Sequence, residues 1–171
     1  LIENTKTSKP INFGVSPWAN HQLMQAWIEP IRKQASDNLD QRVLFKSAGN
    51  MREYLIRAVA GDYDFVQAPA HMGLYLMRYH RFKPIIFILA ESSAFIITGA
   101  NNNYDSLEGL NDVQHALPDK ISISSLETYE LLPDKKMTTY EYKLNHLKVM
   151  DSVIRGETVS GTANSDMYDT L

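Results

Sequence analysis

Five short segments of this 171-residue chain combine small residues with hydroxyl, amide or imidazole groups that could bind a small molecule. They are Ser16-Pro17-Trp18, Ser47 to Asn50, Ala68 to His71, Ser124-Ser125 and Gly161 to Asp166. Each one joins a strand-like run to helical spacing, where the amide groups of a first helical turn point outward and favour a negative ligand group. Ser and Asn at such positions are also ordinary helix caps. Their recurrence in both halves of the chain leaves both roles open.

Candidate ligand contacts follow from these segments. They are Ser16, Trp18, Asn50, Pro69, Ala70, His71, Ser124 and Ser125, together with His146, which heads a later helical pattern. Trp18 could stack on a ligand because it directly follows a Pro that ends a strand, although aromatic residues more often fill a core. His71 and His146 could each donate to a ligand or only pack at an interface.

The sequence gives no positive sign of catalysis or of a cofactor. The five histidines show neither H-x-H nor H-x-x-x-H spacing, so we expect no metal site. No G-x-S-x-G motif is present, and the absence of cysteine excludes a thiol nucleophile, a disulfide framework and a Cys-type zinc site. We therefore expect no catalytic residues, no cofactor and no metal.

The composition of the chain argues against two kinds of partner, nucleic acid and the membrane interior. With 44% hydrophobic residues the chain can bury a core, and its net charge of −3 argues against binding to nucleic acid, because phosphate backbones attract clustered Lys and Arg. No apolar run approaches the roughly 20 residues of a membrane span, so we expect no insertion into the bilayer. Residues 1–10 are polar and unpatterned, which indicates a tether after a removed signal or lipid anchor, or else a trimmed boundary.

The first half of the chain alternates strand and helix signals. Strands are expected at 11–15, 42–46, 63–67 and 84–89, and helices at 23–35, 51–59 and 71–80. Pro30 predicts a kink or a new helix start near Glu29. Asn50 with Glu53 has the form of a capping box, and Gly61 supplies the stop. Parallel pairing through right-handed crossovers is the natural arrangement.

The second half continues this pattern without a long linker. Strands are expected at 95–98, 121–123, 138–143 and 158–160, and helices at 107–113, 126–132, 146–154 and from 166 onward. Together the two halves predict an α/β protein with mainly parallel sheets.

Several of these segments resemble the phosphate/phosphonate-type solute-binding proteins of ABC transporters, a branch of the type 2 periplasmic binding fold. The segments are INFGVSPW, MREYLIRAVAGDYDFVQAPAHMGLYL, DSLEGLNDV, ISSLETYELLP and NHLKVMDSVIRGETVSGTANSDMYD. The resemblance implies a first lobe at 11–92 and a second lobe at 93–171. It also implies that the two lobes close on a ligand without making or breaking a covalent bond. Since relatives return to the first lobe after the final helix, we expect this chain either to be cut or disordered at its C-terminus or to lack part of the second lobe.

The resemblance also implies roles for particular residues. Ser125 and Thr128 match the hydroxyl-rich helix start that grips an oxyanion, His146 matches a histidine before a helix, and Asn164 lies in a loop after a strand. The chain departs from the family pattern at Val159, where relatives carry aspartate, and at Leu126 and Glu127, where they carry small residues. An acidic side chain near an oxyanion is unfavourable unless it points away or meets an amine.

The expected function is binding of a small anionic or zwitterionic ligand, phosphonate- or phosphate-like, and its delivery to the membrane permease of an ABC transporter. The protein would then act in the periplasm or on the outer face of the cytoplasmic membrane. One alternative is a ligand-sensing domain of a signalling receptor with the same fold. Another is a biosynthetic enzyme on this fold, which would need a reactive Lys, His or Asp in the cleft.

Overall fold

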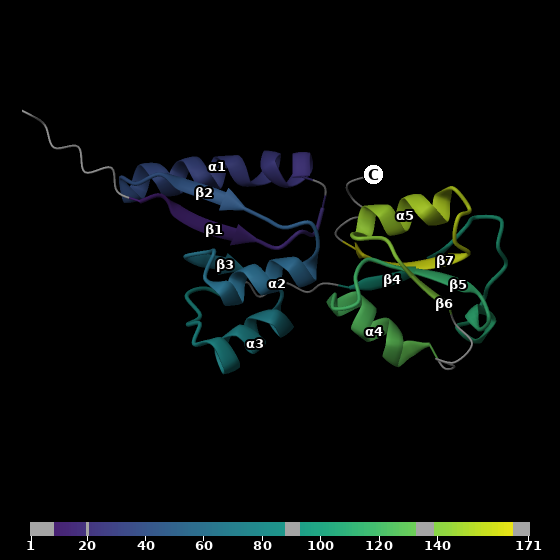
Figure 1. Ribbon diagram of the computed structural model, residues 1–171. Helices are drawn as coiled ribbons and strands as arrows, with labels where there is room; N and C mark the ends of the chain where they lie inside the picture. The colour runs from purple at the N-terminus through teal and green to yellow at the C-terminus, as the bar shows by residue number, and fades with distance from the viewer. Residues whose placement is uncertain (1–8, 20, 88–92, 133–138, 166–171) are drawn as a thin grey trace, which may run out of the picture. The chain divides into compact units, whose positions relative to one another are not determined.

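The structure is a computed structural model that describes residues 9–19, 21–87, 93–132 and 139–165 (Figure 1). The chain divides into two compact units, Leu1–Phe82 and Lys83–Leu171. Each unit has its own sheet. The division falls earlier than the predicted lobe boundary between residues 92 and 93. That boundary and most of the predicted tether at 1–10 lie outside the described residues, so both stay predictions.

The first unit alternates strands and helices as predicted. Its elements are β1 (Ile11–Val15), α1 (His21–Leu39), β2 (Val43–Lys46), α2 (Met51–Ala60), β3 (Phe65–Gln67) and α3 (Ala70–His80). The strands lie in the order β2-β1-β3, and both neighbours pair with β1 in parallel. All three strands therefore end at the same edge of this sheet.

The two faces of the first sheet carry different side chains. Phe13 of β1 lies between Phe45 and Phe65 of the neighbouring strands, with ring centroids 5.0 and 6.2 Å away. Gly14 faces the other way, where an added Cβ would lie 2.6 Å from the ring of Tyr63. The backbone of β1 can approach this ring only because residue 14 has no side chain. Helix α1 covers one face, and α2 and α3 cover the other (Figure 1).

Helix boundaries in the first unit follow local chemistry, with one correction. Asn50 Oδ1 accepts the amide of Glu53 at 2.8 Å, and Gly61 ends α2 in the left-handed region with φ of 83°, as predicted. Of the two alternatives predicted near Glu29, the new helix start is wrong, because α1 continues from His21 to Leu39 through Pro30, and the kink stays a prediction. Pro30 is exposed, so its lost backbone bond leaves a carbonyl that water can reach.

The strand predicted at 84–89 is also wrong over the part that the structure describes. Residues 84–87 have no regular structure, and Ile85, Ile86 and Phe87 are 72%, 80% and 69% exposed. An apolar run becomes a strand only when a neighbour pairs its backbone, and the described sheet contains β2, β1 and β3 alone. Residues 88 and 89 lie outside the described residues.

The second unit contains a four-stranded sheet. Its elements are β4 (Ala94–Thr98), a 3-10 turn (Glu108–Leu110), β5 (Gln114–Leu117), α4 (Ile123–Leu131), β6 (Thr139–Tyr142), α5 (His146–Ile154) and β7 (Ser160–Asn164). The strand order is β4-β7-β5-β6, with β5 parallel to both β6 and β7 and β4 antiparallel to β7. The predicted α/β class with mainly parallel sheets is confirmed. None of the described helices in either unit has the length and apolarity that a membrane crossing requires.

Helices α4 and α5 lie on opposite faces of this sheet (Figure 1). An added Cβ at Gly161 of β7 would lie 2.6 Å from Val149 and 3.2 Å from Val153, so α5 packs directly on the strand backbone. Side chains alternate along a strand, so Ser160 and Thr162 face the other way, toward α4. His115 of β5 joins them there.

Four expected elements of the second unit need correction or stay outside the description. The strand expected at 121–123 is wrong, because Ser122 caps α4 and the strand lies earlier, at Gln114–Leu117. The helix expected at 107–113 is only the 3-10 turn, and the strand expected at 158–160 begins where that range ends. The helix expected from 166 falls outside the described residues.

Candidate functional site

The predicted contacts of the first unit gather at the edge where its three strands end. Ser16 directly follows β1 and is buried, and its Oγ donates to Gln67 Oε1 at 2.8 Å. The amide of Ser16 donates to the same oxygen at 3.2 Å. Ser47 Oγ donates to the carbonyl of Val15 at 2.7 Å, so side chains tie β1 to the residues that end both neighbouring strands.

Trp18 and Asn50 have identifiable structural partners at this edge. The Trp18 ring lies edge-on to Trp27 of α1, with centroids 6.0 Å apart. Asn50 caps α2, while Glu53 Oε2 accepts the amide of Gly49 at 2.9 Å rather than that of Asn50. The capping role is thus present for Asn50, and ligand contact by either residue stays a prediction.

The turn from Ala68 to His71 starts α3 in a different way from the starts of α2, α4 and α5. Pro69 occupies the N-cap with φ of −55° and, among the described residues, gives α3 no side-chain cap. Proline presets the backbone for a helix start and has no side-chain acceptor to compete for the first amides. Ala70 follows with a small side chain, and His71 is half-buried in the first turn. Ligand contact by Pro69, Ala70 and His71 stays a prediction.

The second sheet also brings its predicted contacts to one edge. Because β5, β6 and β7 are parallel, the residues leading into α4, the start of α5 and the end of β7 lie on the same side of the sheet. Ser122 caps α4: its Oγ accepts the amide of Ser125 at 3.2 Å and donates to Ser125 Oγ at 2.8 Å. Ser124 and Ser125 are 0% exposed. They lie within the first turn of α4 rather than in a loop after a strand.

Thr128 lies one turn further along α4 and is buried. Its hydroxyl donates to the carbonyl of Ser124 at 2.7 Å and contacts Thr162 Oγ1 at 2.8 Å. Thr128 therefore joins α4 to β7 in this structure. Glu127 and Leu126, the departures from the family pattern, are both exposed, so the acidic side chain lies on the solvent side of the helix.

His146 and Asn164 meet at this edge. Asn145 caps α5 through its Oδ1, which accepts the amide of Lys148 at 3.0 Å, and His146 is the first residue of the helix. The amide of Asn164 donates to His146 Nδ1 at 3.2 Å. A neutral imidazole that accepts at Nδ1 carries its proton on Nε2, which makes His146 a hydrogen-bond donor through that nitrogen. Asn164 is the last residue of β7 rather than part of a following loop.

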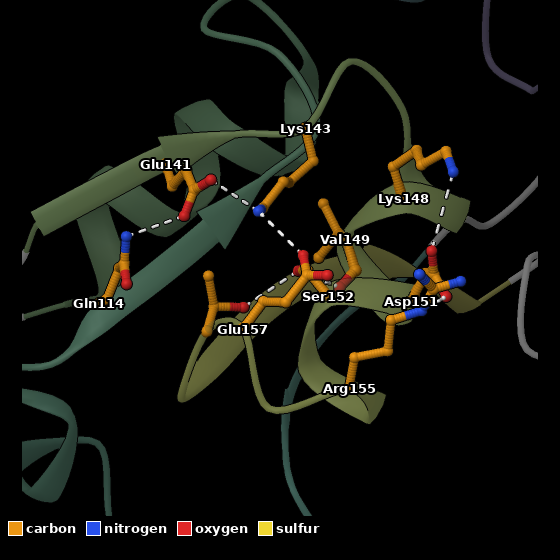
Figure 2. Close-up of polar contacts among 10 residues, drawn as sticks. Gln114, Glu141, Lys143, Lys148, Val149, Asp151, Ser152, Arg155 and Glu157 are labelled. Carbon is orange, nitrogen blue, oxygen red and sulfur yellow. Dashed lines mark hydrogen bonds and ion pairs between the residues drawn. The ribbon is translucent and has the colours of Figure 1, made fainter.

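A polar network at the other end of α5 supports this helix (Figure 2). Lys143 Nζ lies 2.6 Å from Glu141 Oε1 and 3.6 Å from Glu157 Oε2, which joins β6 to the turn after α5. Ser152 Oγ donates to the carbonyl of Val149 at 2.8 Å and contacts Thr158 Oγ1 at 3.0 Å. These bonds close the C-terminal end of the helix whose first residue is His146.

Sequence reasoning missed three residues at or behind these edges. Gln67 holds Ser16, Asn145 caps α5, and His115 contacts Ser160 and Thr162 in the interior. Asn145 carries a readable signal, since Asn before helical spacing is a preferred N-cap. His115 could have been placed only by recognising β5, in which His115 and Leu117 alternate with Gln114 and Ala116.

Two hollows of the described structure lie in the first unit and lack the predicted ligand contacts. One of about 440 Å³ is lined by Lys9, Asn12, Lys46, Arg57, Gly61, Asp62 and Tyr63. The other, of about 360 Å³, lies between α1 and β2. The predicted contacts are instead on strand ends and helix starts, which offer backbone donors rather than an enclosed cavity.

Comparison with known proteins gives a family match. The family described as "ABC transporter, phosphonate, periplasmic substrate-binding protein" matches residues 13–171. No curated protein matches the sequence.

Solved structures give matches to the fold. PhnD1 from Prochlorococcus marinus in complex with methylphosphonate is similar, with a TM-score of 0.79, 16% identity, and coverage of 95% of this chain and 66% of that chain. A binding protein component of an ABC phosphonate transporter from Pseudomonas aeruginosa has a TM-score of 0.73, 16% identity, and coverage of 95% and 59%. The alkanesulfonate-binding protein SsuA from Xanthomonas axonopodis pv. citri, bound to MOPS, has a TM-score of 0.62 and 13% identity, covering 93% and 55%. This chain thus spans about three fifths of their lengths.

Proposed function

The chain belongs to the phosphonate periplasmic substrate-binding protein family of ABC transporters, and we propose that it binds a phosphonate or a phosphate-like anion. In this proposal the protein acts in the periplasm and passes its ligand to a membrane permease. It makes and breaks no bond in the ligand. Among the similar structures, one holds a phosphonate and another a sulfonate, both of which present a tetrahedral oxyanion, and a third is bound to L-arginine.

The observation that carries the proposal is the edge of the second sheet, where the starts of α4 and α5 meet the end of β7. Two helix N-termini there carry partial positive charge. His146 adds a donor through Nε2, oriented by the amide of Asn164 at 3.2 Å. Donors from a helix start and an imidazole on one edge suit an oxyanion, whose oxygens accept several hydrogen bonds at once.

The first unit supplies the second element of the proposal. Helix α3 begins at Pro69-Ala70-His71 without a side-chain cap among the described residues. Pro69 has no side-chain acceptor that competes with a ligand for the first amides of this helix. We propose that this helix start also contacts an anionic ligand group.

The proposal is tested by isothermal titration calorimetry of the full protein with methylphosphonate, inorganic phosphate and methanesulfonate. We expect saturable binding of methylphosphonate or phosphate, and a melting temperature that rises with ligand concentration. His146→Ala should weaken binding by about tenfold or more, because a hydrogen bond to a charged group contributes about 1.5–3 kcal/mol. His80→Ala, at the far end of α3, is the matched control and should bind as the parent does. Absence of binding to all three anions would reject the proposal.

A further inference from the structure

The second unit contains a chain of buried hydrogen bonds that begins at His115. The imidazole is 0% exposed; its Nδ1 lies 2.7 Å from Ser160 Oγ, and its Nε2 lies 2.8 Å from Thr162 Oγ1. Thr162 Oγ1 lies 2.8 Å from Thr128 Oγ1, and Thr128 donates to the carbonyl of Ser124 at 2.7 Å. The chain thus runs from β5 through β7 to the first turn of α4.

Counting protons fixes the direction of every bond in this chain. A carbonyl only accepts, so the single hydroxyl proton of Thr128 goes to Ser124 O. Thr128 Oγ1 must then accept the proton of Thr162, and Thr162 Oγ1 must accept from His115 Nε2–H. Neutral His115 therefore carries its proton on Nε2 and accepts the hydroxyl of Ser160 at Nδ1. Only the Nε2 branch leads to α4, and the Nδ1 branch ends on β7.

The surroundings of His115 keep this arrangement dry and uncharged. Tyr140 of β6 packs edge-on against the imidazole at 6.2 Å, and Tyr129 of α4 packs against Tyr140 at 5.1 Å. Burial raises the pKa of both phenols, so neither carries charge near neutral pH. The acidic residues of α4, Glu127 and Glu130, are exposed, and the charge of Asp119 acts on Tyr129 rather than on the imidazole. His115 thus meets hydroxyl groups and aromatic rings.

We propose that His115 is a positioning residue for anion binding, which holds the first turn of α4 at the edge of the sheet through Thr162 and Thr128. This inference rests on the proposed function and deepens it. Apolar packing can fix how far a helix lies from a sheet, but a directional bond to Ser124 O also fixes how its first turn is placed along β7. His115 touches no ligand itself; it acts through the position of the first turn of α4, which contains Ser124 and Ser125.

Two substitutions at this position separate positioning from simple stability. His115→Gln can keep a donor at the place of Nε2 and so keeps the branch to Thr162, whereas His115→Asn reaches only the place of Nδ1 and keeps the branch to Ser160. Both introduce a smaller amide into the same buried space. In the full protein we expect His115→Gln to bind methylphosphonate within about threefold of the parent and His115→Asn to bind at least about tenfold more weakly. Equal affinities in the two variants would overturn the inference.

A second pair of variants guards against failure of His115 variants to fold. Thr162→Ser keeps the hydroxyl that joins His115 to Thr128, and Thr162→Val removes it with little change of shape. Thr162→Ser should behave as His115→Gln does, and Thr162→Val as His115→Asn does. If both valine and serine variants bind like the parent, the chain of bonds has no role in positioning.

A measurement without ligand separates this inference from the proposed function. Amide hydrogen exchange in the first turns of α4 should be faster in His115→Asn and Thr162→Val than in the parent, and unchanged in His115→Gln and Thr162→Ser. If the parent binds neither methylphosphonate nor inorganic phosphate, the proposed function fails while the exchange data still decide the positioning role. Equal exchange in all variants would refute positioning even if the parent binds its anion.

Discussion

The two units attach a helix to the sheet by different means. In the first unit, α2 rests on aromatic and apolar groups: Tyr54 and Tyr63 stack with centroids 5.2 Å apart, and Ala58 and Leu76 complete the cluster. In the second unit, the face under α4 carries His115, Ser160, Thr162 and Thr128, all buried and joined by hydrogen bonds.

The difference is specific to α4, because α5 packs on the opposite face of the second sheet mainly through apolar side chains. There α5 buries Val149, Met150 and Val153. Dispersion and hydrophobic burial depend on area and tolerate small shifts, whereas each bond of a polar chain depends on direction. A buried polar chain also has a larger penalty when broken, because its groups lose water without gaining a partner. The comparison indicates that α4 is placed with more angular restriction than α2.

The largest predicted effect is a loss of stability in acid, which disrupts the buried polar contacts under α4. Burial lowers the pKa of His115 from its usual 6.5 to about 4, so between these values the unfolded chain binds more protons than the folded one. As far as His115 is concerned, the free energy of unfolding has its full value above about pH 6.5. It falls by about 3 kcal/mol as the pH drops toward about 4. Urea denaturation followed by far-ultraviolet circular dichroism across this range measures it.

The control for this prediction is His115→Gln, which cannot titrate. Carboxylates elsewhere also lose stability in acid, so the informative quantity is the difference between parent and variant at each pH. Both tryptophans, Trp18 and Trp27, belong to the first unit, so their fluorescence should show a transition that does not depend on residue 115. A parent and variant that lose stability in parallel would show that the pKa of His115 does not differ between the folded and unfolded chains.

The next largest effect tests the aromatic packing of the first unit. Gly14→Ala places a Cβ 2.6 Å from two ring carbons of Tyr63, and overpacking of this kind costs about 1–3 kcal/mol. Tryptophan fluorescence in urea should report the loss directly, because it monitors the first unit. Gly73→Ala in α3 is the matched control: no atom lies within 4 Å of its added Cβ, and alanine in a helix is more stable than glycine by about 0.5–1 kcal/mol. Opposite signs for the two changes are expected, and equal signs would contradict the packing described for Gly14.

A smaller effect tests the directional bond that the first unit does have. Tyr54 OH donates to the carbonyl of Gln67 at 2.8 Å, at the end of β3. Tyr54→Phe keeps the ring stack and removes this bond, so the free energy of unfolding should fall by about 1 kcal/mol. Tyr129→Phe, whose partly exposed hydroxyl meets Tyr142 at 2.9 Å, should cost less because water can replace the bond. The reverse order would mean that the stack alone holds α2.

Much of the fold could be predicted because its signals are local. Asn50 and Gly61 bound α2 as read from residue types, and the alternation of strands and helices in the first unit follows from hydrophobic periodicity. The errors came where two local patterns coincide. Ile121-Ser122-Ile123 alternates like a strand, yet a Ser that accepts the amide three residues later begins a helix. The run at 84–87 is apolar enough for a strand but has no described neighbour to pair with.

The sequence could predict where the candidate site residues lie in the fold, but not which hydrogen bonds orient them. Helix starts after parallel strands identify an edge, so Ser16, Asn50, His71 and His146 fall where they were expected, whereas Ser125 lies inside α4. The bonds that orient these residues come from distant segments: Gln67 for Ser16, 51 positions away, and Asn164 for His146, 18 positions away. Spacing in one sequence carries no signal for such partners. The same reason hid His115, whose partners lie 45 and 47 positions further on.

The smallest predicted effect compares an exposed ion pair of the second unit with the buried hydrogen bonds under α4. Lys143 Nζ meets Glu157 at 3.6 Å, and the Glu157 side chain is 53% exposed (Figure 2). Exposed ion pairs contribute about 0–1 kcal/mol because water and salt screen them, so Glu157→Gln should change the free energy of unfolding by less than about 0.5 kcal/mol. Urea denaturation at low and high salt should show that small change shrinking further. Thr162→Val, which removes one buried hydroxyl on the same unit, should exceed it severalfold at both salt concentrations, because burial excludes the solvent that compensates for the surface pair. If Glu157→Gln lowered the free energy of unfolding more than Thr162→Val does, burial would not explain the stability that the polar chain under α4 contributes.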